Sequence, residues 1–555
     1  MEPGPVVRTS ELGRQARLIA SLRHPVVFGA ACTSVRVLET HISTVLLTGT
    51  HAYKIKKAVD LGFLDFTTLA KRRHYCEREL ELNRRLAPEL YLDVGPITGT
   101  VDAPVVGGSG PALEYAVRMR EFPQEALASR LLAHGALGQA DIDALAGKVA
   151  SFHAGNAAAA PDASFGRPDA ILDVALQNFS QIRPLLALAA DRVKVDELEA
   201  WTEREHAAHA AVFRERQQRG FVRECHGDLH LGNIARIDGE LTIFDCIEFN
   251  DDMRWIDVMS EVAFTAMDLR ERGRGDLGQR FLNRYLEITG DYAGLPVLPF
   301  YLAYRAMVRA KVTLMRAVQP GVGAARPALM AEYRAYVDLA RSYARPRHAA
   351  IIATHGLSGS GKTTLSQSLL EALGAVRIRS DVERKRLAGR ATSDRSSDGI
   401  DRGLYAAGST EATYRHVRAL AGAAAAAGQL VIVDAACLKR WQRDLFRDEA
   451  SRVGVPFAIV SFSASEATLR ERVARRTAQG GDASDADLAV LERQLRTQEP
   501  LGRDELSVTV SCDSEGALAE ICRTAAWREI VERVAAAIAG GTTRRTRSAE
   551  SVAAP

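Results

Sequence analysis

The stretch Gly356–Thr363, which reads GLSGSGKT, fits the phosphate-binding pattern G-x-x-x-x-G-K-[ST] at every constrained position. Residues 349–354 before it are largely apolar and β-branched, as in a buried strand, and residues 364–373 after it have helical spacing. A strand, a glycine loop and a helix in this order present backbone N–H groups and a positive helix N-terminus to phosphate. The sequence therefore predicts a phosphate-binding loop in an α/β domain, in preference to a chance glycine-rich turn.

The polar residues of this loop have expected roles. Lys362 should reach the β- and γ-phosphates of a nucleotide, and the Thr363 hydroxyl should hold Mg²⁺. Residues 430–434 read as a second buried strand whose final acid, Asp434, could hold the Mg²⁺ shell through water. No second acid stands next to Asp434, which favours phosphate transfer over an ATPase motor. The expected phosphate contacts are Gly356, Ser358, Gly359, Ser360, Gly361, Lys362, Thr363 and Thr364.

The segment Ser380-Asp381-x-x-Arg384 follows a short strand at 376–379. It resembles the D-x-x-R signature of the polynucleotide-kinase and zeta-toxin-like group of P-loop kinases. The resemblance implies that Asp381 is the general base for an acceptor hydroxyl and that Arg384 orients the phosphates or the acceptor. A helix N-cap is the alternative role for Asp381, and the two roles are compatible.

Residues 466–476 read as a basic helix in which Arg472 and Arg476, at i and i+4, share a face. A glycine-containing turn at 480–486 and another helix follow. This order predicts a lid that closes on ATP and neutralises transition-state charge, with a solvent-exposed charged hairpin as the alternative. Residues 348–535 resemble the small P-loop kinases related to zeta toxins and gluconate kinases, which are grouped with AAA-type ATPases.

A second polar motif lies at Cys225–Asn233, which reads CHGDLHLGN, and Asp245 follows it twelve residues later. The motif resembles the catalytic loop H-x-D-x-x-x-x-N of kinase-like phosphotransferases. In that role Asp228 accepts the proton of the acceptor hydroxyl, and Asn233 and Asp245 coordinate Mg²⁺ on the ATP phosphates. His226 is expected to be a structural hydrogen-bonding group. A surface loop that fits by chance is the alternative.

Residues upstream supply the other parts of a kinase-like site. Residues 40–57 read as two strands around a Thr-Gly-Thr turn, and Lys54 and Lys56 project to one face because they are two positions apart. The helix at 67–86 offers Glu79 as their partner. Either lysine could meet the phosphates, and a solvated strand face is the alternative for each.

Residues 25–340 thus resemble the aminoglycoside phosphotransferase family, a branch of the kinase-like fold. The resemblance implies that Asp257 is a further family aspartate that holds the catalytic loop. The sequence departs from the kinase pattern, because it has no G-x-G-x-x-G loop to cover the phosphates. The whole chain resembles bacterial two-domain proteins that join such a domain to a P-loop kinase domain.

The sequence therefore predicts a mixed α/β and α+β fold. An N-terminal bilobal kinase-like domain precedes a C-terminal P-loop domain with a parallel sheet flanked by helices. The expected limits are a leading segment at 1–25, an N-lobe at 26–122, a C-lobe at 123–345, a P-loop domain at 346–537 and a disordered tail at 538–555.

Composition narrows the class of partner. The formal net charge is only +3, the aromatic content is 6%, and the sequence has no basic stripe interleaved with aromatic residues. These observations argue against nucleic acid as a partner. Residues 1–22 lack an apolar core of signal-peptide length, and the most apolar stretch, 419–438, is interrupted by polar residues. The seven cysteines are dispersed, with no C-x-x-C pair. We expect a cytoplasmic protein with no membrane partner.

The leading hypothesis from the sequence is an ATP-dependent phosphotransferase with two Mg·ATP sites that act on small hydroxyl-bearing molecules. A single catalytic P-loop domain regulated by a nucleotide-binding kinase-like module is the second hypothesis. A nucleic-acid end kinase is a minor third, because the D-x-x-R signature also occurs in polynucleotide kinases.

Overall fold

The computed structural model describes residues 9–30, 32–62, 64–319, 321–345, 348–390, 407–479 and 486–552. The chain divides into two compact units, one of Met1–Ile171 and Phe213–Thr265 and one of Leu172–Val212 and Ala266–Pro555. The chain passes between the units within helices α5 (Pro168–Ile182), α6 (Ala189–Gln218) and α7 (Val258–Glu271). Among the described residues, no helix has the length and apolar character needed to cross a membrane.

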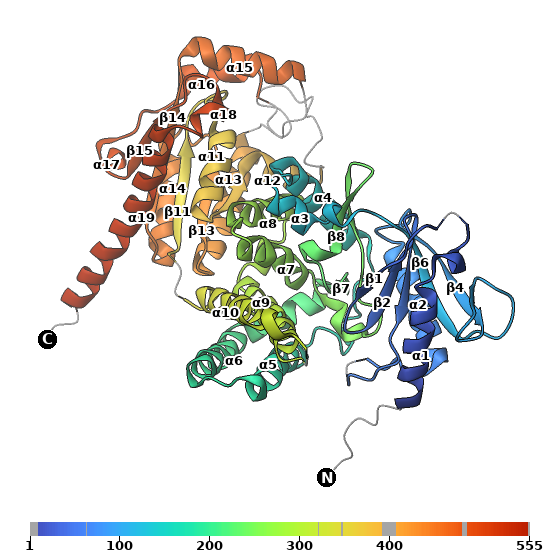
Figure 1. Cartoon of the computed structure of the whole chain (residues 1–555). Coiled ribbons are helices and arrows are strands. Elements are labelled where there is room, and N and C mark those ends of the chain that lie inside the picture. Colours follow the sequence, from blue (N-terminus) through green and yellow to red (C-terminus); the bar gives the residue numbers. More distant parts are fainter. Residues whose placement is uncertain are drawn as a thin grey trace. The chain divides into compact units, whose positions relative to one another are not determined.

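The first unit contains a six-stranded antiparallel sheet with the order β1-β2-β3-β6-β4-β5, drawn in blue in Figure 1. Helix α1 (Thr9–Leu22) and helix α2 (Leu69–Asn83) lie against it, and the Thr68 side chain caps α2 by accepting the Lys71 N–H. The strands are β1 (Arg36–Glu39), β2 (Ser43–Leu47), β3 (His51–Lys56), β4 (Tyr91–Gly99), β5 (Pro104–Val106) and β6 (Glu114–Arg120).

The hairpin predicted within 40–57 is confirmed, since β2 and β3 pair in antiparallel register around Thr48-Gly49-Thr50. Gly49 has φ of +90°, a conformation that glycine adopts without strain. The Gly49 N–H donates to Glu121 Oε2 at 2.7 Å, which fixes the tip of the hairpin to the residue after β6.

The remaining elements of the first unit carry the second motif. Strands β8 and β9 form a hairpin, and Asp238 (φ +52°) and Gly239 (φ +89°) have the positive φ values of a type I′ turn. Strand β7 pairs with β10 and precedes the catalytic-loop motif. The bounds are α3 (Ala128–Ala133), α4 (Gln139–Gly155), β7 (Val222–Glu224), β8 (Ile234–Ile237), β9 (Glu240–Ile243) and β10 (Trp255–Asp257).

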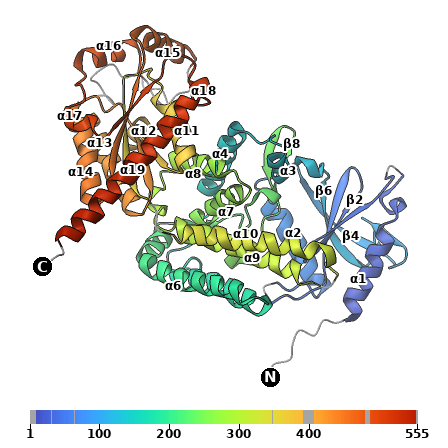
Figure 2. The same cartoon turned by 60° about the vertical axis from the view of Figure 1, so that its left-hand side comes forward.

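The second unit contains a five-stranded parallel sheet with the order β12-β13-β11-β14-β15, so the parallel sheet predicted from the sequence is confirmed. Figure 2 shows helices α13 (Ala407–Ala426) and α14 (Arg440–Val453) on one face and α11 (Lys362–Leu373) and α19 (Ala525–Val552) on the other. The strands are β11 (Ala350–His355), β12 (Val376–Arg379), β13 (Leu430–Asp434), β14 (Phe457–Ser463) and β15 (Thr509–Asp513).

Helix α8 (Gly275–Thr289) covers the open edge of this sheet at β12. The Asn283 side chain accepts the Arg377 N–H at 2.6 Å and donates to the Ala375 carbonyl at 2.9 Å. An edge strand presents unpaired backbone groups, and α8 satisfies two of them with one amide side chain. Helices α9 (Leu298–Ala317) and α10 (Arg326–Tyr343) follow α8 in the same unit.

The last helix of the chain extends into the segment expected as a tail. Helix α19 runs through Val552 and so covers most of the segment 538–555, while residues 553–555 lie outside the described part. Residues 346–347, at the predicted domain boundary, and residues 480–485 of the predicted lid turn also lie outside it.

Candidate active sites

Lys54 and Lys56 on β3 share one carboxylate of α2. Lys54 Nζ donates to Glu79 Oε1 at 2.7 Å, and Lys56 Nζ donates to Glu79 Oε2 at 2.7 Å. Each ammonium has a second acidic partner, which is Asp245 for Lys54 and Glu248 for Lys56. The structure therefore brings both lysines and Glu79 together, as their spacing on a strand and a helix predicts.

The exposed fraction of the second partner separates the two lysines. The Asp245 side chain is 41% exposed, whereas the Glu248 side chain is 3% exposed and Lys56 is fully buried. Burial by itself would lower the pKa of Lys54, but Asp245 and Glu79 raise it well above its usual value, so the ammonium stays charged. Lys54 therefore lies next to a solvent-accessible carboxylate, Asp245, whereas Lys56 lies between two buried carboxylates, Glu79 and Glu248.

The catalytic-loop motif is folded around Asp228. Asn233 Nδ2 donates to Asp228 Oδ2 at 2.9 Å and to the Asp228 carbonyl at 3.0 Å. This orientation turns the Asn233 Oδ1 atom away from Asp228 and makes it available as an oxygen ligand. The Asp228 side chain is 36% exposed, so its carboxylate is accessible from solvent.

His230, which the sequence analysis did not single out, lies beside this carboxylate. His230 Nδ1 accepts the Gly232 N–H at 3.0 Å, and its Nε2 lies 3.4 Å from Asp228 Oδ2. His226 is buried, and burial lowers its pKa; its Nε2 donates to the Phe244 carbonyl at 2.8 Å. The geometry of His226 matches the structural role expected for it.

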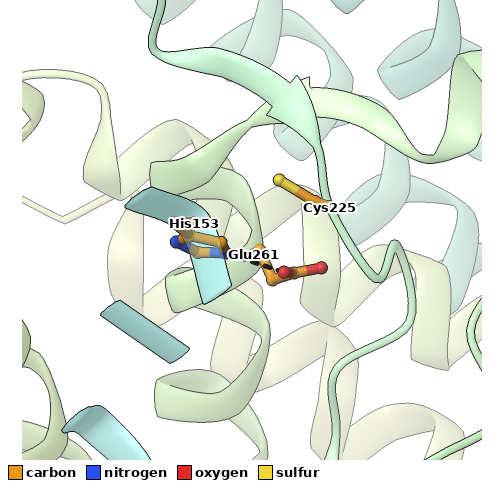
Figure 3. Close-up of side chains that lie close together, drawn as sticks. All are labelled: His153, Cys225 and Glu261. Atoms are coloured by element: carbon orange, nitrogen blue, oxygen red, sulfur yellow. Dashed lines mark hydrogen bonds and ion pairs between the residues drawn. The ribbon is translucent and has the colours of Figure 1, made fainter. Parts of the chain in front are cut away.

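Glu261 on α7 holds the backbone of the loop. Its Oε1 accepts the N–H groups of His226 and Gly227, both at 2.7 Å, and its Oε2 lies 2.8 Å from His153 Nε2 on α4. Figure 3 shows His153 and Cys225 beside the Glu261 carboxylate. Gly227 is required here, because it has φ of +88° and a Cβ would lie 2.7 Å from the Met253 carbonyl oxygen.

The His153, Cys225 and Glu261 side chains are close enough to ligate a metal ion, but their hydrogen bonds argue otherwise. Both Glu261 oxygens already have partners, and the Cys225 Sγ donates to the Ile256 carbonyl. The cluster is therefore a support for the catalytic loop.

Asp257 lies one helical turn before Glu261 and was expected to hold the catalytic loop. It forms a bidentate ion pair with Arg216, at 2.7 and 2.8 Å, and accepts the Met259 N–H at the start of α7. Glu261 contacts the loop backbone directly, at the His226 and Gly227 N–H groups, and the role expected for Asp257 stays a prediction.

The phosphate-binding loop wraps around Lys362, the first residue of α11. Lys362 Nζ donates to the Gly356 and Leu357 carbonyls, both at 2.8 Å. Burial lowers the pKa of Lys362 to about 8, and the nearby Asp434 and Asp381 carboxylates oppose this shift. Lys362 is therefore close enough to Asp381, the predicted base, and to Asp434, the predicted metal ligand, for their charges to shift its pKa.

The glycines of the loop have the backbone conformations that the motif demands. Gly356, Gly359 and Gly361 have φ of +148°, +84° and +80°, and a Cβ on Gly356 would lie 2.5 Å from the Phe462 carbonyl oxygen. Gly361 is the N-cap of α11, Thr364 is exposed on its first turn, and Ser360 Oγ lies 3.5 Å from the lysine ammonium.

Two side chains from the region of the predicted lid contact the loop backbone. Gln494 Oε1 on α16 (Leu488–Thr497) accepts the Ser358 N–H at 2.8 Å. Arg472 on α15 (Glu466–Gln479) donates to the Gly359 carbonyl at 3.2 Å and to the Ser514 carbonyl at 2.6 Å. Arg476 donates to the Ala486 carbonyl at 2.6 Å, and residues 480–485 just before Ala486 lie outside the described part of the chain.

Asp381 and Arg384 form an ion pair of 2.7 Å within α12 (Ser380–Leu387). Arg379 is the N-cap of this helix, so Asp381 is in its first turn and not at the cap position. The Asp381 side chain is 29% exposed, and Arg384 is 9% exposed, which places the carboxylate at the accessible end of the pair.

The donor atoms at both sites suit a divalent cation. Asp434 Oδ2 is buried and accepts no hydrogen bond from the described part of the chain. Asn233 Oδ1 and the exposed Asp245 carboxylate offer oxygen at the other site. Mg²⁺ prefers such oxygen ligands together with substrate phosphates, so the residues fit this ion.

Two family models match this chain. The model described as "Phosphotransferase enzyme family" matches residues 66–298, and the model described as "AAA domain" matches residues 351–501. Proteins titled as uncharacterized from Mycobacterium tuberculosis and Mycobacterium bovis are each 30% identical over 454 residues, covering 81% of this chain and 88% of the relative.

Solved kinase structures also resemble parts of the chain. A gluconokinase from Sinorhizobium meliloti is 26% identical, with a TM-score of 0.23, over 38% of this chain and 99% of its own. A choline/ethanolamine kinase family protein from Mesorhizobium loti is 12% identical, with a TM-score of 0.33, over 60% of this chain and 99% of its own. Both TM-scores are below 0.5, so the family assignment rests on the family models and the mycobacterial relatives.

Proposed function

Because the chain belongs to the same family as the mycobacterial proteins and joins a phosphotransferase enzyme family domain to a P-loop kinase domain, we propose that it carries two Mg·ATP sites. Each site transfers the γ-phosphoryl group of ATP to a hydroxyl of a small molecule. The observation that carries this proposal is that both sites combine a lysine, a separate accessible carboxylate and oxygen ligands for a cation.

At the first site, Lys54 binds the ATP phosphates and Asp228 is the base. The acceptor oxygen forms a bond to the γ-phosphorus, the bond from that phosphorus to the bridging oxygen of ADP breaks, and the acceptor proton moves to Asp228. His230 and Asn233 orient the Asp228 carboxylate. Asn233 and Asp245 would hold Mg²⁺, which neutralises charge on the phosphates.

At the second site, the loop N–H groups and Lys362 bind the phosphates, and Asp381 accepts the proton of the acceptor. Arg384 fixes the Asp381 carboxylate through the 2.7 Å ion pair. Thr363 and Asp434 would hold Mg²⁺ here. Arg472 keeps the loop in place through the Gly359 carbonyl.

The test is acceptor-dependent ADP release by the full-length protein across sugars, aminoglycosides, nucleosides and polyols. Removing one base by Asp228→Asn or Asp381→Asn should lower the rate at least about 100-fold for the acceptors of that site and leave the other acceptors unaffected. If neither variant alters release with any acceptor that the wild type uses, the proposal is wrong.

One observation favours a second candidate, in which the first site only senses nucleotide. The Gly49 N–H lies at the turn that would cover the phosphates, and it is bound to the Glu121 carboxylate, whose negative charge opposes phosphate there. In the Asp381→Asn protein, nucleotide binding without any acceptor-dependent ADP release would favour this sensor. Release that persists with some acceptor would favour the two-site transferase.

A further inference from the structure

A buried charge cluster joins helix α8 to the P-loop site. Glu287 on α8 has a side chain that is 4% exposed, and its Oε1 accepts from Arg377 Nη2 at 2.8 Å and from Arg377 Nε at 3.2 Å. Its Oε2 lies 3.8 Å from Arg379 Nη1. Both arginines belong to the edge strand β12, whereas residue 287 lies in the segment matched by the phosphotransferase enzyme family model.

The two arginines continue from this carboxylate to opposite sides of the nucleotide site. Arg377 Nη1 donates to the Thr363 carbonyl at 2.8 Å and to Ser366 Oγ at 3.3 Å, on the first turn of α11. Arg379 Nε lies 3.6 Å from Asp434 Oδ2. Thr363 and Asp434 are the residues proposed above to hold Mg²⁺ at this site.

Glu287 is a buried counter-charge that both β12 arginines share, and Arg284 on its own helix also lies 3.7 Å from its Oε2. Burial by itself would raise the pKa of Glu287, but Arg377 and Arg379 lower it, so the carboxylate is ionised. Without this carboxylate, Arg377 would lose its bidentate partner, and Arg379 would lose the carboxylate that it contacts in addition to Asp434. The Arg379 guanidinium, which already lies 3.6 Å from Asp434 Oδ2, would then move closer to that oxygen and compete with a cation for it.

We propose that Glu287 is a positioning residue for the P-loop site, which holds Arg377 on the Thr363 backbone and weakens the pairing of Arg379 with Asp434 by sharing the Arg379 guanidinium. The proposal rests on the proposed function of this site, since it concerns the Mg²⁺ ligands. A residue of the phosphotransferase segment thereby sets the cation requirement of the P-loop kinase segment.

The test measures the Mg²⁺ concentration needed for half-maximal ADP binding by calorimetry of the full-length protein. An Asp245→Asn background removes a proposed metal ligand from the other site, so the signal belongs to the P-loop site. Glu287→Gln should raise this concentration about tenfold, as loss of an outer-sphere partner does in metal sites. The matched control is Glu371→Gln, which breaks the 2.8 Å ion pair of α11 with Arg280 of the same helix α8.

A second substitution separates positioning from general stability. Adding Arg379→Gln to Glu287→Gln removes the competing charge, so the Mg²⁺ requirement should return to within about twofold of the background value. An equal effect of Glu287→Gln and Glu371→Gln, or no recovery in the double variant, would overturn the proposal. If the background protein binds no Mg·ADP, the proposed function of this site fails; binding with an unaltered Mg²⁺ requirement in Glu287→Gln contradicts the positioning role alone.

Discussion

At the residue scale, Lys54 and Lys56 illustrate how one strand face yields two different environments. They share Glu79, and each has one further carboxylate. Asp245 is solvent-accessible and Glu248 is buried, so only Lys54 has a route to a ligand. This difference is set by Asp245 and Glu248, which lie 191 and 192 positions after Lys54 and Lys56 in the chain.

Methionine substitutions should separate the two lysines. Lys54→Met should lower phosphotransfer at the first site at least about 100-fold, because a cation on the phosphates is lost. Its effect on stability should be small, since Glu79 keeps Lys56. Lys56→Met leaves Glu248 buried without its ammonium and should cost about 3–5 kcal/mol of unfolding free energy.

The two readouts are acceptor-dependent ADP release and urea unfolding of each variant. A stable but inactive Lys56→Met protein together with an active Lys54→Met protein would contradict this prediction. It would indicate that Lys56, and not Lys54, contacts the phosphates.

At the scale of elements, the catalytic loop is shaped by a helix that follows it in the sequence. Glu261 on α7 binds two consecutive loop N–H groups, and α4 contributes His153 behind it. The conformation of residues 226–228 therefore depends on one carboxylate from α7 and on the positive φ of Gly227.

Removing this carboxylate should act on one site only. Glu261→Ala leaves two buried N–H groups and His153 without their acceptor, which costs about 1–3 kcal/mol for each unsatisfied group. We expect ADP release at the first site to fall at least about tenfold, while Asp381-dependent release is unchanged. The matched control is Glu215→Ala, which removes an exposed ion pair with Arg219 in the same unit. Equal losses at both sites would indicate a global defect.

Local patterns explain which parts of the sites the sequence could predict. The P-loop, Asp434, Asp228 and Asn233 occur at fixed short spacings, and β-branched runs and turn residues predict the strands and hairpins around them. Glu261 and Glu287 contact partners 35 and 90 positions away, and one acid on a helix gives no periodic signal. Only the fold brings Gln494 to the Ser358 N–H, which lies 136 positions earlier in the chain.

At the scale of the whole molecule, the second unit contains both the P-loop sheet and helices that precede it in the chain. The family models end at residue 298 and resume at residue 351, yet α8 is bound to β12 through side chains and backbone. The predicted domain limits remain predictions, and the structure favours treating α8 together with the sheet.

Hydrogen exchange should show that the edge strand β12 depends on helix α8 for its protection. In a fragment of residues 348–555, the Arg377 amide loses its acceptor, Asn283, and should exchange at least about tenfold faster than in the full-length protein. The amides of β11, which is paired on both sides, are the internal control. Equal protection of Arg377 in the two proteins would show that the edge of the sheet is stable without α8.

The contact between α8 and β12 also bears on how such genes can be recombined. Asn283 recognises main-chain groups, so the strand can change its side chains over evolution without losing the helix, whereas the Glu287 pair requires arginines at two fixed positions. A chimera that joins the P-loop segment to another partner would keep the buried Arg377 but lose its Glu287 counter-charge. A recombination point that keeps α8 together with β12 therefore lies before Gly275, the first residue of α8.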